Sequence, residues 1–282
     1  MTNSPARTPV SPTAHWIAAV RARESERPDA LFRDPYAAIL AGDAGRASLA
    51  ASERASGGET HFLAVRTRFF DEVLCAESRA GDAVVLLGAG LDTRAFRLPL
   101  PPDIDWYEID EGALLATKER VLHGVGASSS CRTRQPVAVD LGGPWSEALA
   151  GAGFVAGRRT IWLAEGLLFY LSMEVAGAVL GEACRLSGPR SLILGDVTGT
   201  GLHRLPMMQP YLASRSRQGL PPPFATDDPA GLFAQAGWTS VALFEPWRLA
   251  ISHGRPLGPT TAGPSTSDPS MQSHVVLARL GG

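Results

Sequence analysis

Cysteine is scarce in this sequence of 282 residues. The three cysteines, Cys75, Cys131 and Cys184, lie far apart and form neither a CxxC motif nor a Cys/His spacing typical of a metal site. Their low and odd number argues against a disulfide scaffold and suits a reducing compartment. We therefore predict a cytoplasmic protein without a metal centre.

The sequence also lacks long apolar runs and a large excess of charges of one sign. The N-terminal stretch 1–16 lacks the apolar core of a signal peptide, and runs such as 83–87 fall well short of the ~20 residues of a membrane helix. The formal net charge of −2 gives no general attraction to nucleic acid or to an anionic membrane. We expect neither of them as a partner.

Hydrophobic residues make up 45% of the chain, which is enough for a proper core. Short apolar runs that suit buried strands alternate with helical stretches, and this alternation predicts an α/β fold with a mostly parallel sheet. The expected strands are 83–87, 106–110, 136–141, 160–164, 191–196, 240–245 and 274–280. The expected helices between and after them are 113–122, 145–150, 173–186 and 229–236.

These elements divide one domain into four segments. We predict that residues 13–76 form an N-terminal helical cover and that residues 77–196 form the core that binds a cofactor. Residues 197–228 are rich in proline and break the alternation, while residues 229–282 complete the sheet. An insertion at the carboxyl end of a strand lies where open α/β sheets bind ligands, so we expect 197–228 to form an acceptor pocket or its lid. A peripheral loop that packs only for stability is the alternative.

A glycine turn follows the first strand in the segment VVLLGAGLDTR, residues 84–94. Gly88 and Gly90 let the backbone turn tightly and approach a ligand, because no Cβ stands in the way. A dinucleotide fingerprint would have its third glycine where this chain has Thr93, and Asp92 would repel a pyrophosphate. A cofactor with a cationic end tolerates that carboxylate, and S-adenosylmethionine has a sulfonium, an ammonium and no phosphate.

Acidic residues stand at the ends of the next strands. Asp110 ends the second strand about twenty residues after the glycines, where a carboxylate can accept both hydroxyls of a ribose. Glu108 lies on the same face of that strand and is the alternative. Asp140 and the Leu141 amide follow the third strand and suit an adenine, while Glu165 ends the fourth and suits an ammonium group.

The chain resembles the leucine carboxyl methyltransferase family, in particular its bacterial branch of polyketide-type O-methyltransferases. The resemblance covers roughly residues 13–245, and its most specific blocks are LGAGLDTR and EGLLFYL. Further matching segments are RARESERPDALFRDPYA (21–37), VRTRFFDEVL (65–74), WYEIDEGALLATKERVL (106–122) and AQAGW (234–238). The resemblance implies a class I methyltransferase fold with a Rossmann-like sheet of seven strands and S-adenosylmethionine as cofactor.

By motif position, the resemblance implies that Arg66 binds the carboxylate of S-adenosylmethionine, with Arg21 as a second cationic contact. A guanidinium suits this role because its fork can bond both oxygens of a carboxylate. An ion pair between Arg66 and nearby Asp71 is the structural alternative. Tyr170 and His203 are the candidate catalytic residues, although Tyr170 can equally be a packed core aromatic and a lone histidine is more often structural.

We therefore predict an S-adenosylmethionine-dependent O-methyltransferase that acts on a small molecule of polyketide or other secondary metabolism. The absence of an evident general base favours a carboxylate acceptor, because a carboxylic acid is already ionised at neutral pH. A phenol or hydroxyl acceptor stays open, as does a relative that binds the cofactor without catalysis. An NAD-dependent oxidoreductase is disfavoured by Thr93 and by the absence of a Tyr-x-x-x-Lys pair.

Overall fold

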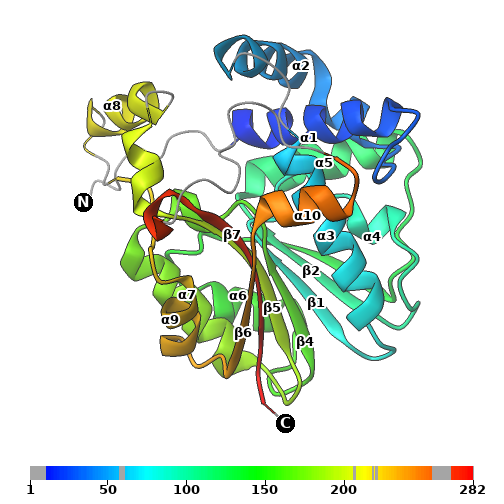
Figure 1. Cartoon of the computed structure of the whole chain (residues 1–282). Coiled ribbons are helices and arrows are strands. Elements are labelled where there is room, and N and C mark those ends of the chain that lie inside the picture. Colours follow the sequence, from blue (N-terminus) through cyan, green and yellow to red (C-terminus); the bar gives the residue numbers. More distant parts are fainter. Residues whose placement is uncertain are drawn as a thin grey trace.

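The computed structural model describes residues 11–56, 61–205, 208–217, 219, 222–255 and 268–281. Within them, seven strands form one open sheet at the centre of the protein (Figure 1). The strands are β1 (Ala83–Leu87), β2 (Asp105–Asp110), β3 (Thr133–Ala138), β4 (Thr160–Ala164), β5 (Leu192–Thr198), β6 (Ser240–Phe244) and β7 (Ser273–Arg279). Their order across the sheet is β3-β2-β1-β4-β5-β7-β6, with β1 to β5 parallel and β7 antiparallel to both of its neighbours.

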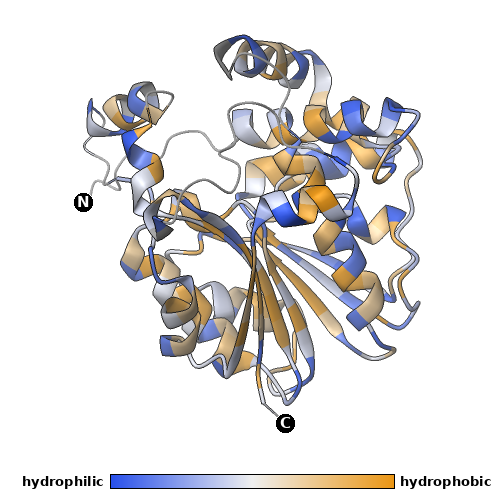
Figure 2. Cartoon of the chain, in the orientation of Figure 1, coloured by the Kyte–Doolittle hydropathy of each residue, from blue (hydrophilic) through white to orange (hydrophobic). Residues whose placement is uncertain are grey.

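Helices cover both faces of the sheet because its central strands are apolar on both sides (Figure 2). Successive side chains of a strand point to opposite faces, so Val84 and Leu86 pack with the helices of one face while Val85 and Leu87 pack with those of the other. The first face carries α3 (Phe62–Glu77) and α4 (Arg94–Arg97), and the second carries α6 (Trp145–Gly151), α7 (Met173–Leu186) and α9 (Pro229–Gln235).

Two N-terminal helices pack together beyond the carboxyl ends of the parallel strands (Figure 1). They are α1 (Ser11–Glu26) and α2 (Ala37–Ser56), the latter kinked at Gly42. Ala18, Leu40 and Leu91 form a small apolar cluster with Leu114 of α5 (Gly112–Gly124). This cluster fixes the helices next to the glycine turn after β1.

Six strands lie within two residues of their predicted bounds at each end, and β1 and β4 match them fully. The prediction for β3 was wrong by three residues at each end, because the strand is Thr133–Ala138 and not 136–141. Only Val137 of β3 is buried, since the strand lies at the edge of the sheet, so no apolar run marks it. Pro136 is tolerated there because an edge strand can lack one backbone donor.

Three helices were not predicted, the short α4 described above, α8 (Gln209–Arg217) and α10 (Pro246–Ser252). The segment 197–228 also contains a short 3-10 helix at Thr200–Arg204, while Phe224 packs into the core. The glycine- and proline-rich composition of residues 254–273 predicts an exposed hairpin connection, and that of residues 1–12 predicts a frayed tail; most of both segments lies outside the described residues.

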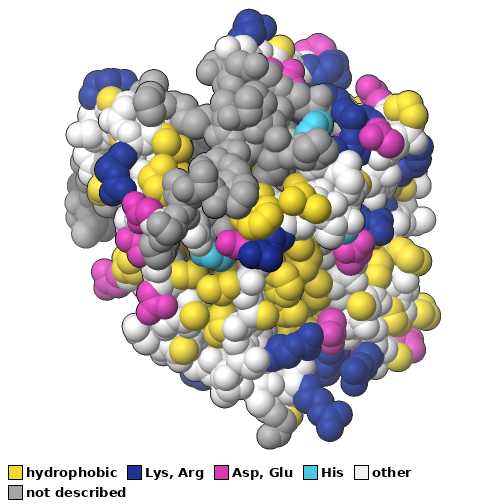
Figure 3. Space-filling view, in the orientation of Figure 1, with side chains coloured by type: hydrophobic (Ala, Val, Ile, Leu, Met, Phe, Trp, Pro, Cys, Tyr) yellow, Lys and Arg dark blue, Asp and Glu magenta, His cyan; other side chains and the backbone are white. Residues whose placement is uncertain are grey.

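Apolar side chains gather on the surface over β6 and β7, below α10 (Figure 3). Leu243 of β6 is 38% exposed and Ile251 of α10 is 68% exposed. Among the described residues, every helix is too short or too polar to span a bilayer.

Candidate cofactor site

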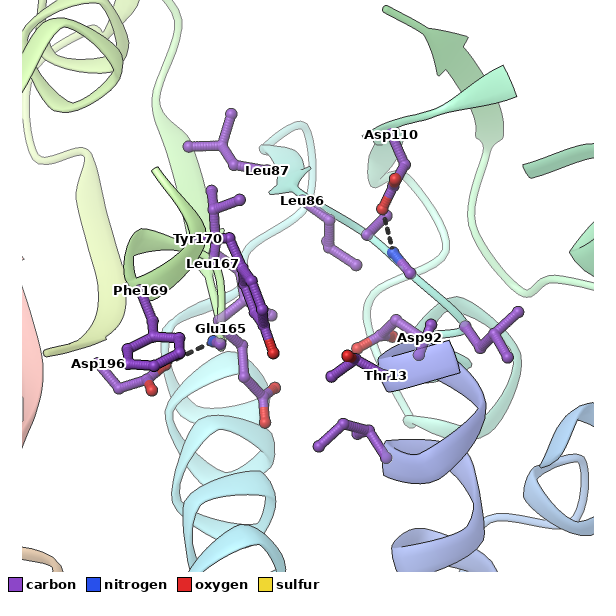
Figure 4. A pocket seen from close by; sticks show the side chains of 18 of the residues that line it. Thr13, Leu86, Leu87, Asp92, Asp110, Glu165, Leu167, Phe169, Tyr170 and Asp196 are labelled. Atoms are coloured by element: carbon purple, nitrogen blue, oxygen red, sulfur yellow. Dashed lines mark hydrogen bonds between the residues drawn. The ribbon is translucent and has the colours of Figure 1, made fainter. Parts of the chain in front are cut away.

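A cavity of about 460 Å³ opens at the carboxyl ends of β1, β2, β4 and β5, next to α1 (Figure 4). In open α/β sheets this edge is where ligands bind, because the loops after parallel strands meet there. Nine of the residues proposed from the sequence line the cavity: Arg21, Arg66, Gly88, Gly90, Asp110, Asp140, Leu141, Glu165 and Tyr170. The tenth, His203, does not.

The glycine turn forms the floor of the cavity. Gly88 and Gly90 adopt φ angles of +68° and +51°, the left-handed region that glycine enters without steric cost. A Cβ at Gly88 would lie 2.8 Å from Leu167 Cδ1, so the turn also has no room for a larger residue there. The backbone of this loop is therefore open toward a ligand.

Asp110 reaches the cavity, whereas Glu108 does not. Asp110 Oδ2 accepts a hydrogen bond of 2.6 Å from the Gly90 amide, and Oδ1 accepts one of 2.6 Å from the Glu111 amide. Burial raises the pKa of Asp110. Glu108 instead bonds Lys118 Nζ at 2.7 Å and Arg134, and it is only 1% exposed. The geometry therefore favours Asp110 over its alternative as the ribose ligand.

Asp140 and Leu141 lie in the loop after β3, on the same side of the cavity as Asp110. Asp140 Oδ1 accepts a hydrogen bond of 2.8 Å from the Gly142 amide, which fixes the carboxylate in a tight turn. Leu141 is 7% exposed and anchors that turn in the core. Because β3 ends three residues earlier than predicted, both residues lie in a loop, which still places them in the lining of the cavity.

Arg66 of α3 lies between two carboxylates at the opposite end of the cavity. Its Nε donates to Glu165 Oε1 at 3.0 Å, and its Nη1 donates to Asp196 Oδ2 at 2.9 Å. Asp71, the partner considered for Arg66, bonds Arg94 instead. Both carboxylates and the guanidinium line the cavity, so this end presents both signs of charge to a ligand.

The buried side chain of Arg94 connects the segments that line the cavity. Its side chain is 1% exposed and pairs with Asp71 Oδ1 at 2.7 Å, with Glu165 Oε2 at 2.7 Å, and with Asp92. Burial opposes the charged form of Glu165, but the charges of Arg94 and Arg66 outweigh it and lower the pKa of this carboxyl. Arg94 therefore joins α3, the glycine loop and the end of β4 in one buried ion network.

Arg21 also lines the cavity, but its guanidinium is engaged with the protein. Nε donates to Asp34 Oδ2 at 2.9 Å, and Nη2 donates to the Leu91 carbonyl at 2.6 Å. Thr93 Oγ1 donates to the same Asp34 oxygen at 2.7 Å. Thr93, which stands in place of a third glycine, thus ties the loop to the helical cover.

The two candidate catalytic residues have different surroundings. Tyr170 lines the cavity near Thr13 of α1, and burial raises the pKa of its hydroxyl, so the phenol stays protonated at neutral pH. His203 lies outside the cavity lining, and burial lowers its pKa. The proposal of His203 as a general base therefore has no support from its position.

The cavity lining carries more negative than positive side chains. Its described residues include three arginines, Arg21, Arg66 and Arg94, and six carboxylates, Asp92, Asp110, Glu111, Asp140, Glu165 and Asp196. An anionic ligand such as a pyrophosphate is disfavoured by this balance, and a cationic one is favoured. In the described part of the chain, no group of three or more His, Cys, Asp or Glu residues has the arrangement of a metal site.

Asp196, Trp16 and Thr198 are among the lining residues that were not anticipated as site residues. Asp196 could have been found from the sequence, because it follows the apolar run 192–194 of the fifth strand as Glu165 follows that of the fourth. Trp16 Nε1 and Thr198 Oγ1 are buried and have no hydrogen-bond partner among the described residues. No sequence signal distinguishes them from packed side chains.

Comparisons with known proteins identify the family of this chain. Residues 14–183 match the leucine carboxyl methyltransferase family. A protein of Parafrankia sp. (strain EAN1pec) described as an S-adenosyl-L-methionine-dependent methyltransferase is 44% identical over 67% of this chain and 64% of its own length. One of Mycobacterium avium (strain 104) with the same description is 36% identical over 97% and 91%. The crystal structure of a protein of Thermobifida fusca YX, described as a methyltransferase, superposes with a TM-score of 0.58 at 20% identity, covering 92% of this chain and 96% of that one.

The sheet order, with its antiparallel β7 and the cavity beyond β1, defines a class I methyltransferase. Within this class, the family match covers more than half of the 282 residues, and the Mycobacterium avium protein matches over nearly its whole length. The chain belongs to the leucine carboxyl methyltransferase family.

Proposed function

We propose that this protein transfers the methyl group of S-adenosylmethionine to a carboxylate oxygen of a small molecule, such as a polyketide or another secondary metabolite. The methyltransferase class and the S-adenosylmethionine cofactor follow from the family and the fold. The observation that carries the proposal is the cavity itself, whose open glycine turn and carboxylates suit the cationic cofactor, while the Trp16 N–H and Thr198 hydroxyl, unpartnered among the described residues, can hold an acceptor oxygen.

The residues of the cavity fit this cofactor. Asp110 would accept the ribose hydroxyls, and the Asp140 carboxylate with the Leu141 amide would pair with the adenine. Arg66 would bind the carboxylate of the methionine end, since its guanidinium lines the cavity and bonds Glu165 and Asp196 through Nε and Nη1 and not through Nη2. Bound S-adenosylmethionine supplies an electrophilic methyl group on a sulfonium, and the surrounding carboxylates stabilise its positive charge.

The acceptor side of the cavity is apolar with a few donors. Trp16, Phe62, Phe169, Tyr170 and Met208 contribute its apolar and aromatic walls. The unpartnered Trp16 N–H can only donate a hydrogen bond, and the Thr198 hydroxyl can also donate. Such donors suit an acceptor that presents an oxygen on an otherwise apolar body.

Catalysis by these residues would consist of positioning and the exclusion of water. The cover helix α1 contributes Thr13 and Trp16 to the cavity wall, and Tyr170 lies near Thr13 in that wall. Tyr170 stays protonated, so its ring lines the cavity and its hydroxyl can form a hydrogen bond, but it does not act as a base. A carboxylate acceptor needs no base, which suits the absence of a histidine from the described cavity lining.

A phenolic or hydroxyl acceptor is the second candidate, because aromatic rings line the acceptor side. Phe169 stacks on Tyr211 of α8 with ring centroids 5.5 Å apart, and it lines the cavity itself. A planar aromatic acceptor would find matching surfaces there. This candidate differs from the first in needing a proton acceptor.

The acceptor oxygen can be identified chemically. Small organic acids and phenols are incubated with the protein and S-adenosylmethionine carrying a labelled methyl group, and products that gain CH2 are found by mass spectrometry. A methyl ester releases labelled methanol in mild alkali, whereas a methyl ether does not. Alkali-stable products would contradict the carboxylate proposal and support the phenolic one.

The pH dependence gives a separate prediction for the acceptor found in this way. Under the carboxylate proposal, single-turnover methyl transfer is expected to stay flat from about pH 6 to 9, because the nucleophile is ionised throughout. His203→Ala should leave this rate within about tenfold, since loss of a true base costs roughly 10²–10⁴-fold. A rate that rises with pH and collapses in His203→Ala would contradict the prediction.

A further inference from the structure

The end of α1 is held to the body of the protein by an arginine that lies far from it in the sequence. Arg255 follows α10, which packs against α3 on one face of the sheet, and the chain leaves α10 toward α1 (Figure 1). The Arg255 side chain bonds the last turn of α1 and the loop after it. Arg255 is 3% exposed and does not line the cavity. It therefore connects α1 to the sheet layer from outside the site.

The guanidinium of Arg255 bonds three oxygen atoms at this end of α1. Nη2 donates to Glu24 Oε1 at 2.9 Å and to the Asp29 carbonyl at 2.6 Å, and Nη1 donates to Asp29 Oδ2 at 3.0 Å. Glu24 is 2% exposed, and its Oε1 also accepts from the Leu31 amide at 2.7 Å. Because the charges of Arg255 and Glu24 are buried, removal of one partner leaves the other at a high cost in free energy. These contacts therefore stabilise the observed position of α1.

The helix that these contacts hold forms one wall of the cofactor cavity. Five residues of α1 line the cavity: Thr13, Ala14, Trp16, Ile17 and Arg21. Arg21 lies three residues before Glu24, and its Nη2 donates to the Leu91 carbonyl in the loop after β1. A displacement of this end of α1 would therefore move both the wall of the cavity and a contact of the glycine loop.

We propose that α1 moves away from the cavity when the cofactor or its product enters or leaves, and that Arg255 sets the rate of this opening. Covers over active sites often control ligand exchange in this way. Because Arg255 lies outside the cavity lining, its contacts stabilise the closed position equally with and without a ligand. Arg255 is thus a positioning residue that acts through α1 on the rates of exchange and not on the affinity. This inference rests on the proposed function, because it assumes that S-adenosylmethionine occupies the cavity.

Surface plasmon resonance can measure the association and dissociation rate constants of S-adenosylhomocysteine for the wild-type protein and for Arg255→Met. Both rate constants are expected to rise about tenfold, the factor of one charged hydrogen bond, while the dissociation constant stays within about twofold. Arg255→Lys keeps the positive charge beside Glu24 and loses the fork, so its rate constants should lie between those of the other two proteins. The lysine variant decides the question if circular dichroism shows that the methionine variant is unfolded.

Arg279→Met is the matched control, because Arg279 pairs with Glu77 at 2.7 Å and its side chain is 41% exposed. This variant should leave both rate constants unchanged. Unchanged rate constants in the Arg255 variants would overturn the inference. A lower affinity with an unchanged association rate would overturn it as well, because Arg255 would then only maintain the shape of the site. Wild-type protein that does not bind S-adenosylhomocysteine would overturn the proposed function and this inference with it.

Discussion

Replacement of Arg94 by methionine is expected to lower the free energy of unfolding by about 3–5 kcal/mol, the cost of leaving buried charges without their partner. The Arg94 side chain is 1% exposed, and its removal leaves Asp71, Asp92 and Glu165 in the interior without a shared cation. Methionine replaces much of the buried volume, so the change reports mainly on charge. Urea unfolding of both proteins measures the difference.

Arg185→Met is the matched control, since Arg185 pairs with Glu182 on the surface and its side chain is 65% exposed. Exposed pairs contribute about 0–1 kcal/mol, so the control should change stability by no more than that. Equal effects of the two substitutions would show that the buried network does not stabilise the fold as described.

The buried ion network of Arg94 also predicts how the free energy of unfolding depends on pH. Burial favours the protonated form of Asp92, but the charge of Arg94 and of further cations outweighs it and lowers the pKa to about 2, from an ordinary value of 3.8. Because the folded pKa lies below the unfolded one, this stabilisation is complete above about pH 4 and is lost as the pH falls toward 2. Between pH 4 and pH 2, the free energy of unfolding of Arg94→Met should therefore fall less than that of the wild-type protein.

Replacement of Asp110 by alanine is expected to weaken S-adenosylhomocysteine binding by about 1.5–3 kcal/mol, or roughly 10- to 150-fold, as for charged hydrogen bonds. The carboxylate lines the cavity at the end of β2 and accepts the Gly90 and Glu111 amides, so it both contacts the ligand and orders the loop. Calorimetric titration measures the affinity.

Asp110→Asn separates the two roles, because its amide oxygen can still accept one backbone hydrogen bond while the charge is lost. Asp103→Ala, at an exposed position before β2, should leave the affinity unchanged. Unchanged affinity in Asp110→Ala would remove this residue from the site.

The sequence predicted best where one physical signal determines the structure. β1 and β4 are short runs of buried apolar residues, so the pattern marked their ends. β3 was displaced because an edge strand with one buried side chain has no such pattern. α10 was missed although Pro246 at its first turn is a helix-start signal, because the expected strand ended beside it.

The residues of the site show the same difference between those that one signal predicts and those that it does not. Gly88, Asp110 and Glu165 were found because parallel strands place their ends at one edge of the sheet. The ion pairs of Arg94 could not be predicted, since three separate elements contribute the charges and only their packing brings them together.

The central claim, that the cavity binds S-adenosylmethionine, is tested most directly by calorimetric titration of the wild-type protein with S-adenosylhomocysteine and, separately, with NADH. The account predicts saturable binding of S-adenosylhomocysteine at one site per chain and no binding of NADH, whose pyrophosphate would face the carboxylates of the cavity. Binding of NADH without binding of S-adenosylhomocysteine would contradict it.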